Sequence, residues 1–199
     1  MKSFHALAGL ITCLALAACA SLPTDYAREP SEAFKDHQST EFGARIARAA
    51  TEHPDQSGFA LLRYGRQAFT GRVAVTAKAE HTLDVQYYIW ENDATGHILS
   101  QRLLEAADRG IRVRVLLDDI NLKGRDDHIA SLDAHPNVEI RLFNPFVHRS
   151  ARVLDFVANL DRVNHRMHNK LIIMDNAFAI VGGRNIGNHY FQVAEDANF

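Results

Sequence analysis

The chain has 199 residues, with 22 lysines and arginines, 24 aspartates and glutamates, and a formal net charge of −2. This balance gives no global attraction to nucleic acid or to an anionic membrane, and it disfavours a protein that binds nucleic acid non-specifically. A chain of this length is long enough to bury one sizeable hydrophobic core.

The first segment has the features of a bacterial lipoprotein signal. Lys2 precedes an apolar run, residues 6–18, which is too short to span a bilayer comfortably. The tetrapeptide Leu16-Ala-Ala-Cys19 resembles a lipobox, which implies cleavage before Cys19 and a lipid on its thiol. The sequence therefore predicts a signal peptide over residues 1–18 and a periplasm-facing lipoprotein of the cell envelope, with the outer membrane favoured. An uncleaved anchor is the alternative.

The cysteines and histidines give no sign of a metal centre. Both cysteines, Cys13 and Cys19, lie at the N-terminus, so the rest of the chain has neither a disulfide nor a cysteine metal site. None of the 11 histidines occurs in an H-x-H or H-E-x-x-H pattern. We expect no metal and no cofactor.

Beyond Cys19, a polar stretch precedes alternating strands and helices. Residues 19–57 read as a tether with an amphipathic helix near 34–50, and residues 58–199 as one domain. The predicted elements of the domain are strand 59–64, helix 67–79, strand 83–90, helix 98–108, strand 111–117, helix 126–134 and strand 138–143. Such alternation predicts an α/β sandwich with a mixed, largely parallel sheet.

A β-hairpin follows near the C-terminus. Residues 170–174 and 177–181 are apolar and β-favouring, and Asp175-Asn176 between them is a turn signal. Gly182 and Gly183 follow the second strand and allow a close approach to the backbone. The hairpin would fix any residue at its ends on a rigid part of the core.

The residues at the start of this hairpin point to phosphate chemistry. Residues two apart in a strand face the same side, so the imidazole of His168 and the ammonium of Lys170 should emerge together. One phosphate could then meet both a nucleophile and a fixed positive charge.

The same residues carry a family resemblance. The pattern H-x-K-x4-D-x6-G-G-x-N resembles the HKD motif of the phospholipase D superfamily. The strand-helix-strand pattern of residues 83–119 is similar to the one that precedes the motif in that superfamily. The sequences of residues 164–170 and 180–187 are similar to bacterial cardiolipin synthases, particularly those of the C-type branch. The motif residues are His168, Lys170, Asp175, Gly182, Gly183 and Asn185.

The resemblance implies a phospholipase D-like α/β/α sandwich and a catalytic mechanism. His168 would attack phosphorus and form a phosphohistidine, Lys170 would stabilise the charge on the phosphoryl oxygens, and Asp175 would complete the catalytic set. Asp175 could instead serve only the turn. Asn185, Gly183 and Arg166 are the predicted phosphate contacts.

The resemblance also implies a second motif. Superfamily enzymes pair two HKD histidines, and this chain has one, so we expect it to be the N-terminal half of a longer enzyme or to form a homodimer. The implied substrate is a membrane phospholipid, and no nucleic acid is expected. A superfamily endonuclease and a non-catalytic phosphate-binding lipoprotein are the alternatives.

Three further features have two interpretations each. Asp118-Asp119 after a strand is either a metal or acid pair or, as we favour, a helix cap with loop salt bridges. The apolar residues of 146–157 form either a lip for acyl chains or a buried interface. The basic residues before the motif form either a solvated face or a phosphate funnel. These basic residues are Arg141, His148, Arg149, Arg152, Arg162, His165, Arg166 and Lys170.

Overall fold

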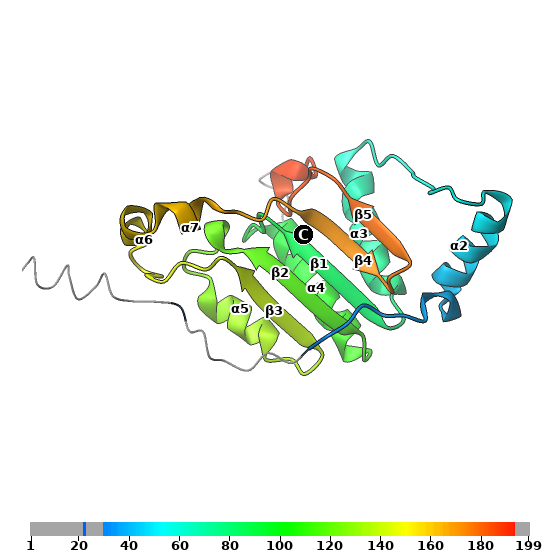
Figure 1. Cartoon of the computed structure of the whole chain (residues 1–199), viewed down its shortest axis with the longest axis horizontal. Coiled ribbons are helices and arrows are strands. Elements are labelled where there is room, and N and C mark those ends of the chain that lie inside the picture. Colours follow the sequence, from blue (N-terminus) through cyan, green and yellow to red (C-terminus); the bar gives the residue numbers. More distant parts are fainter. Residues whose placement is uncertain (1–21, 23–29, 194–199) are drawn as a thin grey trace, which may run out of the picture.

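The computed structural model describes residue 22 and residues 30–193, and its centre is a five-stranded mixed sheet (Figure 1). The signal peptide and Cys19 lie outside the described residues. The strands run in the order β3-β2-β1-β4-β5, and their bounds are β1 Thr82–Tyr87, β2 Arg112–Asp118, β3 Val138–Phe143, β4 Lys170–Met174 and β5 Phe178–Val181. Because β1 pairs in parallel with β2, and β2 with β3, while β4 is antiparallel to both β1 and β5, four of the five strands point the same way.

Helices cover one face of this sheet. The α-helices are α2 Glu41–Glu52, α3 Gly65–Lys78, α4 Ala94–Asp108, α5 Asp126–Asp133, α6 Val153–Ala158 and α7 Leu160–Asn164, with short 3-10 turns η1 His37–Ser39, η2 Asp119–Asn121 and η3 Asn188–Tyr190. The crossovers through α4 and α5 both lead to the next parallel strand in the same direction. Right-handed crossovers of that kind place their helices on one side of a sheet. Figure 1 shows α3, α4 and α5 together behind the strands.

The hydrophobic core lies between these helices and the sheet. Along β1, Leu83, Val85 and Tyr87 are buried, whereas the residues between them are less so. This period of two places every second side chain against the helices. Leu99 and Leu103 of α4 meet them from the other layer.

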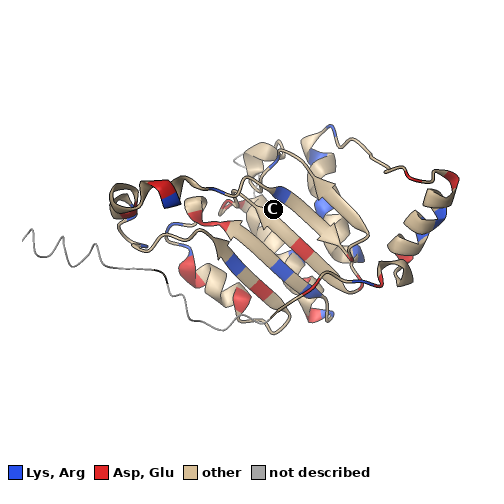
Figure 2. Cartoon of the chain, in the orientation of Figure 1, with Lys and Arg blue, Asp and Glu red and all other residues tan. Residues whose placement is uncertain are grey.

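The opposite face of the sheet is polar. Figure 2 shows charged residues of both signs on the strands, among them the ion pair of Arg114 on β2 with Asp84 on β1. The N-terminal segment crosses this face at the start of the strands, where Arg112 donates to the carbonyl of Glu32 at 2.7 Å and Phe34 stacks on His81. Part of the predicted tether therefore packs on the domain.

Most of the predicted elements are confirmed, with shifted ends. The strand predicted to reach Trp90 ends at Tyr87, and Trp90 forms only a single bridge with Ile186. The helix predicted near 34–50 is found at 41–52 as α2. The fold class, an α/β domain with a mixed sheet, is as predicted.

The strand predicted at residues 59–64 is wrong. The segment is irregular, and Phe59 is 91% and Leu61 78% exposed. A strand needs a neighbour for its backbone hydrogen bonds, and these residues have no strand beside them in the described chain.

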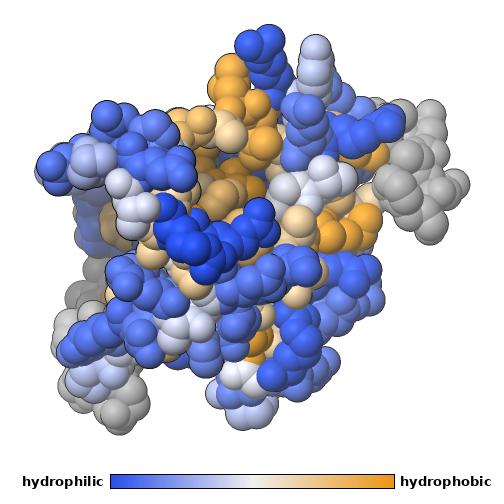
Figure 3. Space-filling view, turned by 90° about the vertical axis from the view of Figure 1, so that its right-hand side faces the viewer, coloured by the Kyte–Doolittle hydropathy of each residue, from blue (hydrophilic) through white to orange (hydrophobic). Residues whose placement is uncertain are grey.

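Seen from the side that carries α2, apolar patches interrupt a hydrophilic surface, and some lie in a hollow (Figure 3).

Two short helices, α6 and α7, fill the region between β3 and the hairpin. The apolar residues of 146–157 were expected to form either a lip for acyl chains or a buried interface. Phe146 is 2% exposed, whereas Val153 and Val157 of α6 are open to solvent. Within residues 30–193, the structure contains no helix with the length and apolar character needed to cross a membrane.

Candidate active site

The candidate site lies at the edge of the sheet where the parallel strands end. β4 runs the opposite way from β1, so its first residue, Lys170, pairs with the last residue of β1, Tyr87. His168 precedes β4 by two residues. The hairpin therefore delivers the start of the motif to the edge where α/β sheets commonly bind ligands.

Lys170 is a buried cation. It is 5% exposed, and its Nζ donates to the carbonyl oxygen of His168 at 2.9 Å. It also lies 4.9 Å from the ring centroid of Tyr88, a cation–π contact. No carboxylate pairs with it within the described residues. Burial lowers the pKa of Lys170 from its usual 10.5, as expected for an ammonium that is withdrawn from water.

His168 is exposed and lies against the same aromatic ring. Its ring centroid is 4.8 Å from that of Tyr88. Tyr88 therefore contacts both the imidazole and the ammonium, and it brings the two groups together as sequence analysis expected. The open imidazole can meet a substrate from solvent while the cation stays fixed beneath it.

The glycine pair lies beside Lys170. The amide of Gly182 donates to the carbonyl of Lys170 at 3.2 Å, so the loop after β5 adjoins the start of β4. A Cβ added at Gly182 or Gly183 would meet no atom within 4 Å. The space above the pair is open, which leaves room for a phosphate to approach the backbone.

Asn185, a predicted phosphate contact, uses both polar atoms of its side chain in hydrogen bonds within the protein. It is 4% exposed; its Oδ1 accepts from the amide of Ile89 at 3.0 Å, and its Nδ2 donates to the hydroxyl of Tyr190 at 3.0 Å. These bonds connect the loop after β5 to the loop after β1. Asn185 shapes the walls of the site in this structure.

Asp175 is not brought together with His168 and Lys170. It follows the last residue of β4 and lies five positions along the chain from Lys170, roughly 16 Å away in an extended strand. Its fully buried carboxylate accepts three backbone amides, from Glu80 at 2.9 Å, His81 at 2.8 Å and Thr82 at 2.7 Å. This geometry fits the turn interpretation, because the carboxylate anchors the hairpin to the start of β1.

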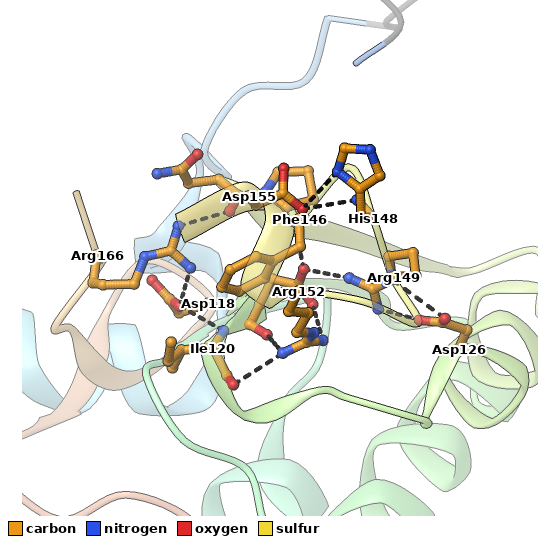
Figure 4. A network of polar contacts seen from close by, with 12 residues as sticks. Asp118, Ile120, Asp126, Phe146, His148, Arg149, Arg152, Asp155 and Arg166 are labelled. Carbon is orange, nitrogen blue, oxygen red and sulfur yellow. Dashed lines mark hydrogen bonds and ion pairs between the residues drawn. The ribbon is translucent and has the colours of Figure 1, made fainter. Parts of the chain in front are cut away.

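Arg166, the third predicted phosphate contact, points into the protein. Its Nη1 donates to Asp118 at 3.0 Å, and its Nη2 donates to the carbonyl of Asn144 at 2.7 Å. Figure 4 shows this ion pair within a larger network around Phe146.

The network also accounts for three other arginines of this stretch. Arg149 and Arg152 pair with the fully buried Asp119, and Arg162 pairs with the fully buried Asp155. These arginines are therefore neither a solvated face nor a free phosphate funnel. They neutralise buried carboxylates and hold residues 144–166 over the end of β2.

Asp118-Asp119 forms the cap and salt bridges that we favoured over a metal pair. Asp118 accepts the amide of Ile120 at 2.8 Å as the N-cap of η2, and Asp119 accepts the amide of Phe146 at 2.7 Å. In the described part of the chain, no three His, Cys, Asp or Glu residues lie close enough to form a metal site.

The motif alone did not reveal Tyr88. The sequence shows that Tyr87 and Tyr88 must face opposite sides of a strand, but it does not say which of them faces the core. Tyr87 is fully buried and bonded to Arg72 at 2.8 Å. Leu83 and Val85 are apolar and lie four and two positions before Tyr87, so they share its face of the strand. This alternation could have indicated that Tyr87 faces the core and Tyr88 the other side.

Comparison with known proteins identifies the class to which this site belongs. The profile of the family described as "Cardiolipin synthase, PLD-like domain" matches residues 73–199, more than half of the chain. The chain belongs to this phospholipase D-like family.

Individual relatives agree with the family. The chain is 49% identical over 149 residues to cardiolipin synthase C of Escherichia coli, covering 75% of this chain and 32% of the relative. It is 36% identical over 149 residues to a cardiolipin synthase of Geobacillus kaustophilus, covering 73% and 28%. A solved structure, NucT from Helicobacter pylori, aligns at 19% identity with a TM-score of 0.48, over 67% of this chain and 76% of that one. The chain spans about a third of the length of the two cardiolipin synthases.

Proposed function

We propose that the chain provides one catalytic half of a phospholipase D-type phosphatidyltransferase or phospholipase acting on membrane phospholipids, as in a cardiolipin synthase. The observation that carries the proposal is the pairing of a buried ammonium with an exposed imidazole across one aromatic ring. The distances from Tyr88 to Lys170 and to His168 are 4.9 and 4.8 Å.

The proposed reaction has two displacements. In the first, a ring nitrogen of His168 forms a bond to phosphorus while the bond from phosphorus to the leaving alcohol oxygen breaks. Lys170 stabilises the negative charge on the phosphoryl oxygens. In the second, a glycerol-type hydroxyl or water forms a bond to phosphorus, the bond from phosphorus to His168 breaks, and the proton of the attacking oxygen passes to the group that acted as general acid in the first displacement.

The leaving oxygen needs a proton from a general acid. The family resemblance assigns this role to the histidine of a second HKD motif, in the same longer chain or in a second copy. We therefore propose that a partner half completes the site. Asp175, Asn185 and Arg166 support the scaffold in this proposal, whereas Gly183 borders the space for the phosphate.

Phospholipid turnover tests this function. The full-length protein is incubated with phosphatidylglycerol labelled at phosphorus, and acid-labile, alkali-stable label on the protein is measured with the products. We expect His168→Ala to abolish both signals. The matched control is His165→Ala, which alters an exposed histidine three residues earlier and should keep both.

Two results would redirect the proposal. Cleavage of plasmid DNA by the wild type, without phospholipid turnover, would favour the endonuclease alternative. Equal inertness of wild type and His168→Ala toward both substrates would favour a phosphate-binding lipoprotein.

We also propose that a signal peptide over residues 1–18 is removed, that Cys19 carries lipid, that residues 19–57 connect it to the domain at 58–199, and that the protein faces the periplasm. Metabolic labelling with a fatty acid tests the anchor. Cys19→Ser should lose both the label and the membrane fraction, whereas Cys13→Ser should keep the label.

A further inference from the structure

Asp118 lies at the point where β2 meets the segment that carries the motif. It is the last residue of β2 and pairs with Phe143, the last residue of β3, so its backbone belongs to the sheet. Its side chain is fully buried. One oxygen accepts from the Met167 amide at 2.7 Å; the other accepts from the Ile120 amide at 2.8 Å and from Arg166 at 3.0 Å.

The contact with Met167 bears directly on His168, the next residue. The amide of Met167 is tied to Asp118, and the carbonyl of Asn169 accepts from the amide of Tyr88 at 3.0 Å. Hydrogen bonds to the last residue of β2 and to the residue after β1 thus clamp the backbone on both sides of His168. Because peptide groups are planar, fixing both neighbours restricts where the imidazole can lie.

We propose that Asp118 is a positioning residue for His168. Its buried charge holds the Met167 amide, and the ion pair with Arg166 keeps that charge compensated. The catalytic part of this inference rests on the proposed function. The positional part stands without it, since it concerns where the imidazole lies.

The neighbouring Asp119 offers a matched comparison. It is fully buried, accepts one backbone amide of the same segment and pairs with two arginines. The difference is the point of attachment, since Asp119 holds Phe146, far along the chain from His168. If Asp118 only stiffened the loop, the two aspartates would be equivalent.

The experiment compares Asp118→Asn with Asp119→Asn in the full-length protein. Both changes keep the side-chain size and remove one charge, so both should lower stability in urea unfolding. The imidazole signals of His168 are then recorded by NMR with labelled histidine and assigned by their loss in His168→Ala. We expect Asp118→Asn to shift or broaden these signals and Asp119→Asn to leave them in place.

Turnover of labelled phosphatidylglycerol gives the second readout. Asp118→Asn should lower kcat per folded molecule by roughly tenfold to a hundredfold with KM little changed, because displacement of a reacting group by about 1 Å costs that much. Asp119→Asn should stay within about twofold of the wild type.

Unchanged His168 signals in Asp118→Asn, or equal effects of the two substitutions, would overturn the assignment. If Asp118→Asn does not fold, Arg166→Gln takes its place, because it leaves the buried charge of Asp118 without its counter-ion and so weakens the hold of that carboxylate on the Met167 amide. It should shift the His168 signals in the absence of substrate, and the lack of any shift would also overturn the proposal. An inactive wild type would refute the proposed function, while the NMR comparison would still decide the positional claim.

Discussion

The two ends of β4 differ in almost every physical respect. At its start, Lys170 is a buried ammonium without a carboxylate partner in the described chain, beside the exposed His168. At its end, Asp175 is a buried carboxylate with both oxygens occupied by backbone amides. One end has unused binding capacity, whereas the other has none.

The two ends of β4 therefore place different demands on the HKD motif, one for binding a charged group and one for holding a turn. A site that must bind and release a charged group needs an unsatisfied charge, which is costly to bury. A turn that must stay folded needs every buried polar atom to be paired. β4 connects the two, so the anchored end keeps the reactive end in register with β1.

The largest expected effect comes from removing the free charge. Lys170→Met should lower phospholipid turnover by roughly 100- to 1,000-fold, the range for losing one stabilising donor in a transition state. Stability should not fall, since a buried ammonium without a counter-ion is itself costly. Turnover assays and urea unfolding measure the two quantities.

The exposed Lys123 provides the control, and Lys123→Met should change neither. A Lys170→Met protein that unfolds more easily and keeps its turnover would reverse the roles of the two ends.

Asp175→Asn should have the opposite pattern. An amide nitrogen in place of a carboxylate oxygen faces backbone donors, so the free energy of unfolding should drop by about 3 kcal/mol. Turnover per folded molecule should stay within about twofold of the wild type. The adjacent Asn176→Gly is the control: both turn residues have φ of +51°, which glycine adopts readily.

Loss of turnover in a fully folded Asp175→Asn protein, at a protein concentration corrected for unfolding, would give Asp175 a direct catalytic role instead.

Tyr88 tests whether the ring joins the two reactive groups. Tyr88→Ala should lower turnover about tenfold, because it removes both the cation–π contact and the ring against His168. Tyr88→Phe keeps the ring and should stay within about twofold. A phenylalanine variant as impaired as the alanine variant would assign the effect to the hydroxyl.

The smallest expected effect is a pH dependence of stability. The pKa of Lys170 is lower in the folded protein than the 10.5 of an exposed lysine. Between these two values the unfolded chain holds more protons, so folding becomes more favourable as pH rises. The stability advantage of Lys170→Met over the wild type should therefore be full below the folded-state pKa of Lys170 and shrink as pH rises toward 10.5, as urea unfolding across pH would measure. A difference in unfolding free energy between the two proteins that does not change with pH would contradict a lowered pKa of Lys170.

Sequence patterns predicted most helices and strands well, but they predicted poorly which distant residues pair with one another. The strands predicted at residues 83–90, 111–117 and 138–143 correspond to β1 to β3, and the hairpin was placed because Asp175-Asn176 separates two apolar runs. The strand predicted at 59–64 failed because strand formation depends on a neighbour, which composition does not reveal. Arg166 was expected to contact a phosphate. The sequence did not reveal its actual partner, Asp118, because that residue lies 48 positions away.

The sequence by itself determined the α/β class, the hairpin and the two groups that we propose for phosphate chemistry, because these depend on residue type and short spacing. Only the tertiary structure decided that Lys170 is buried, that Asp175 anchors β1 and that the arginines neutralise buried aspartates. These properties depend on which distant segments share a hydrogen bond or exclude water, and the packing of the sheet decides that.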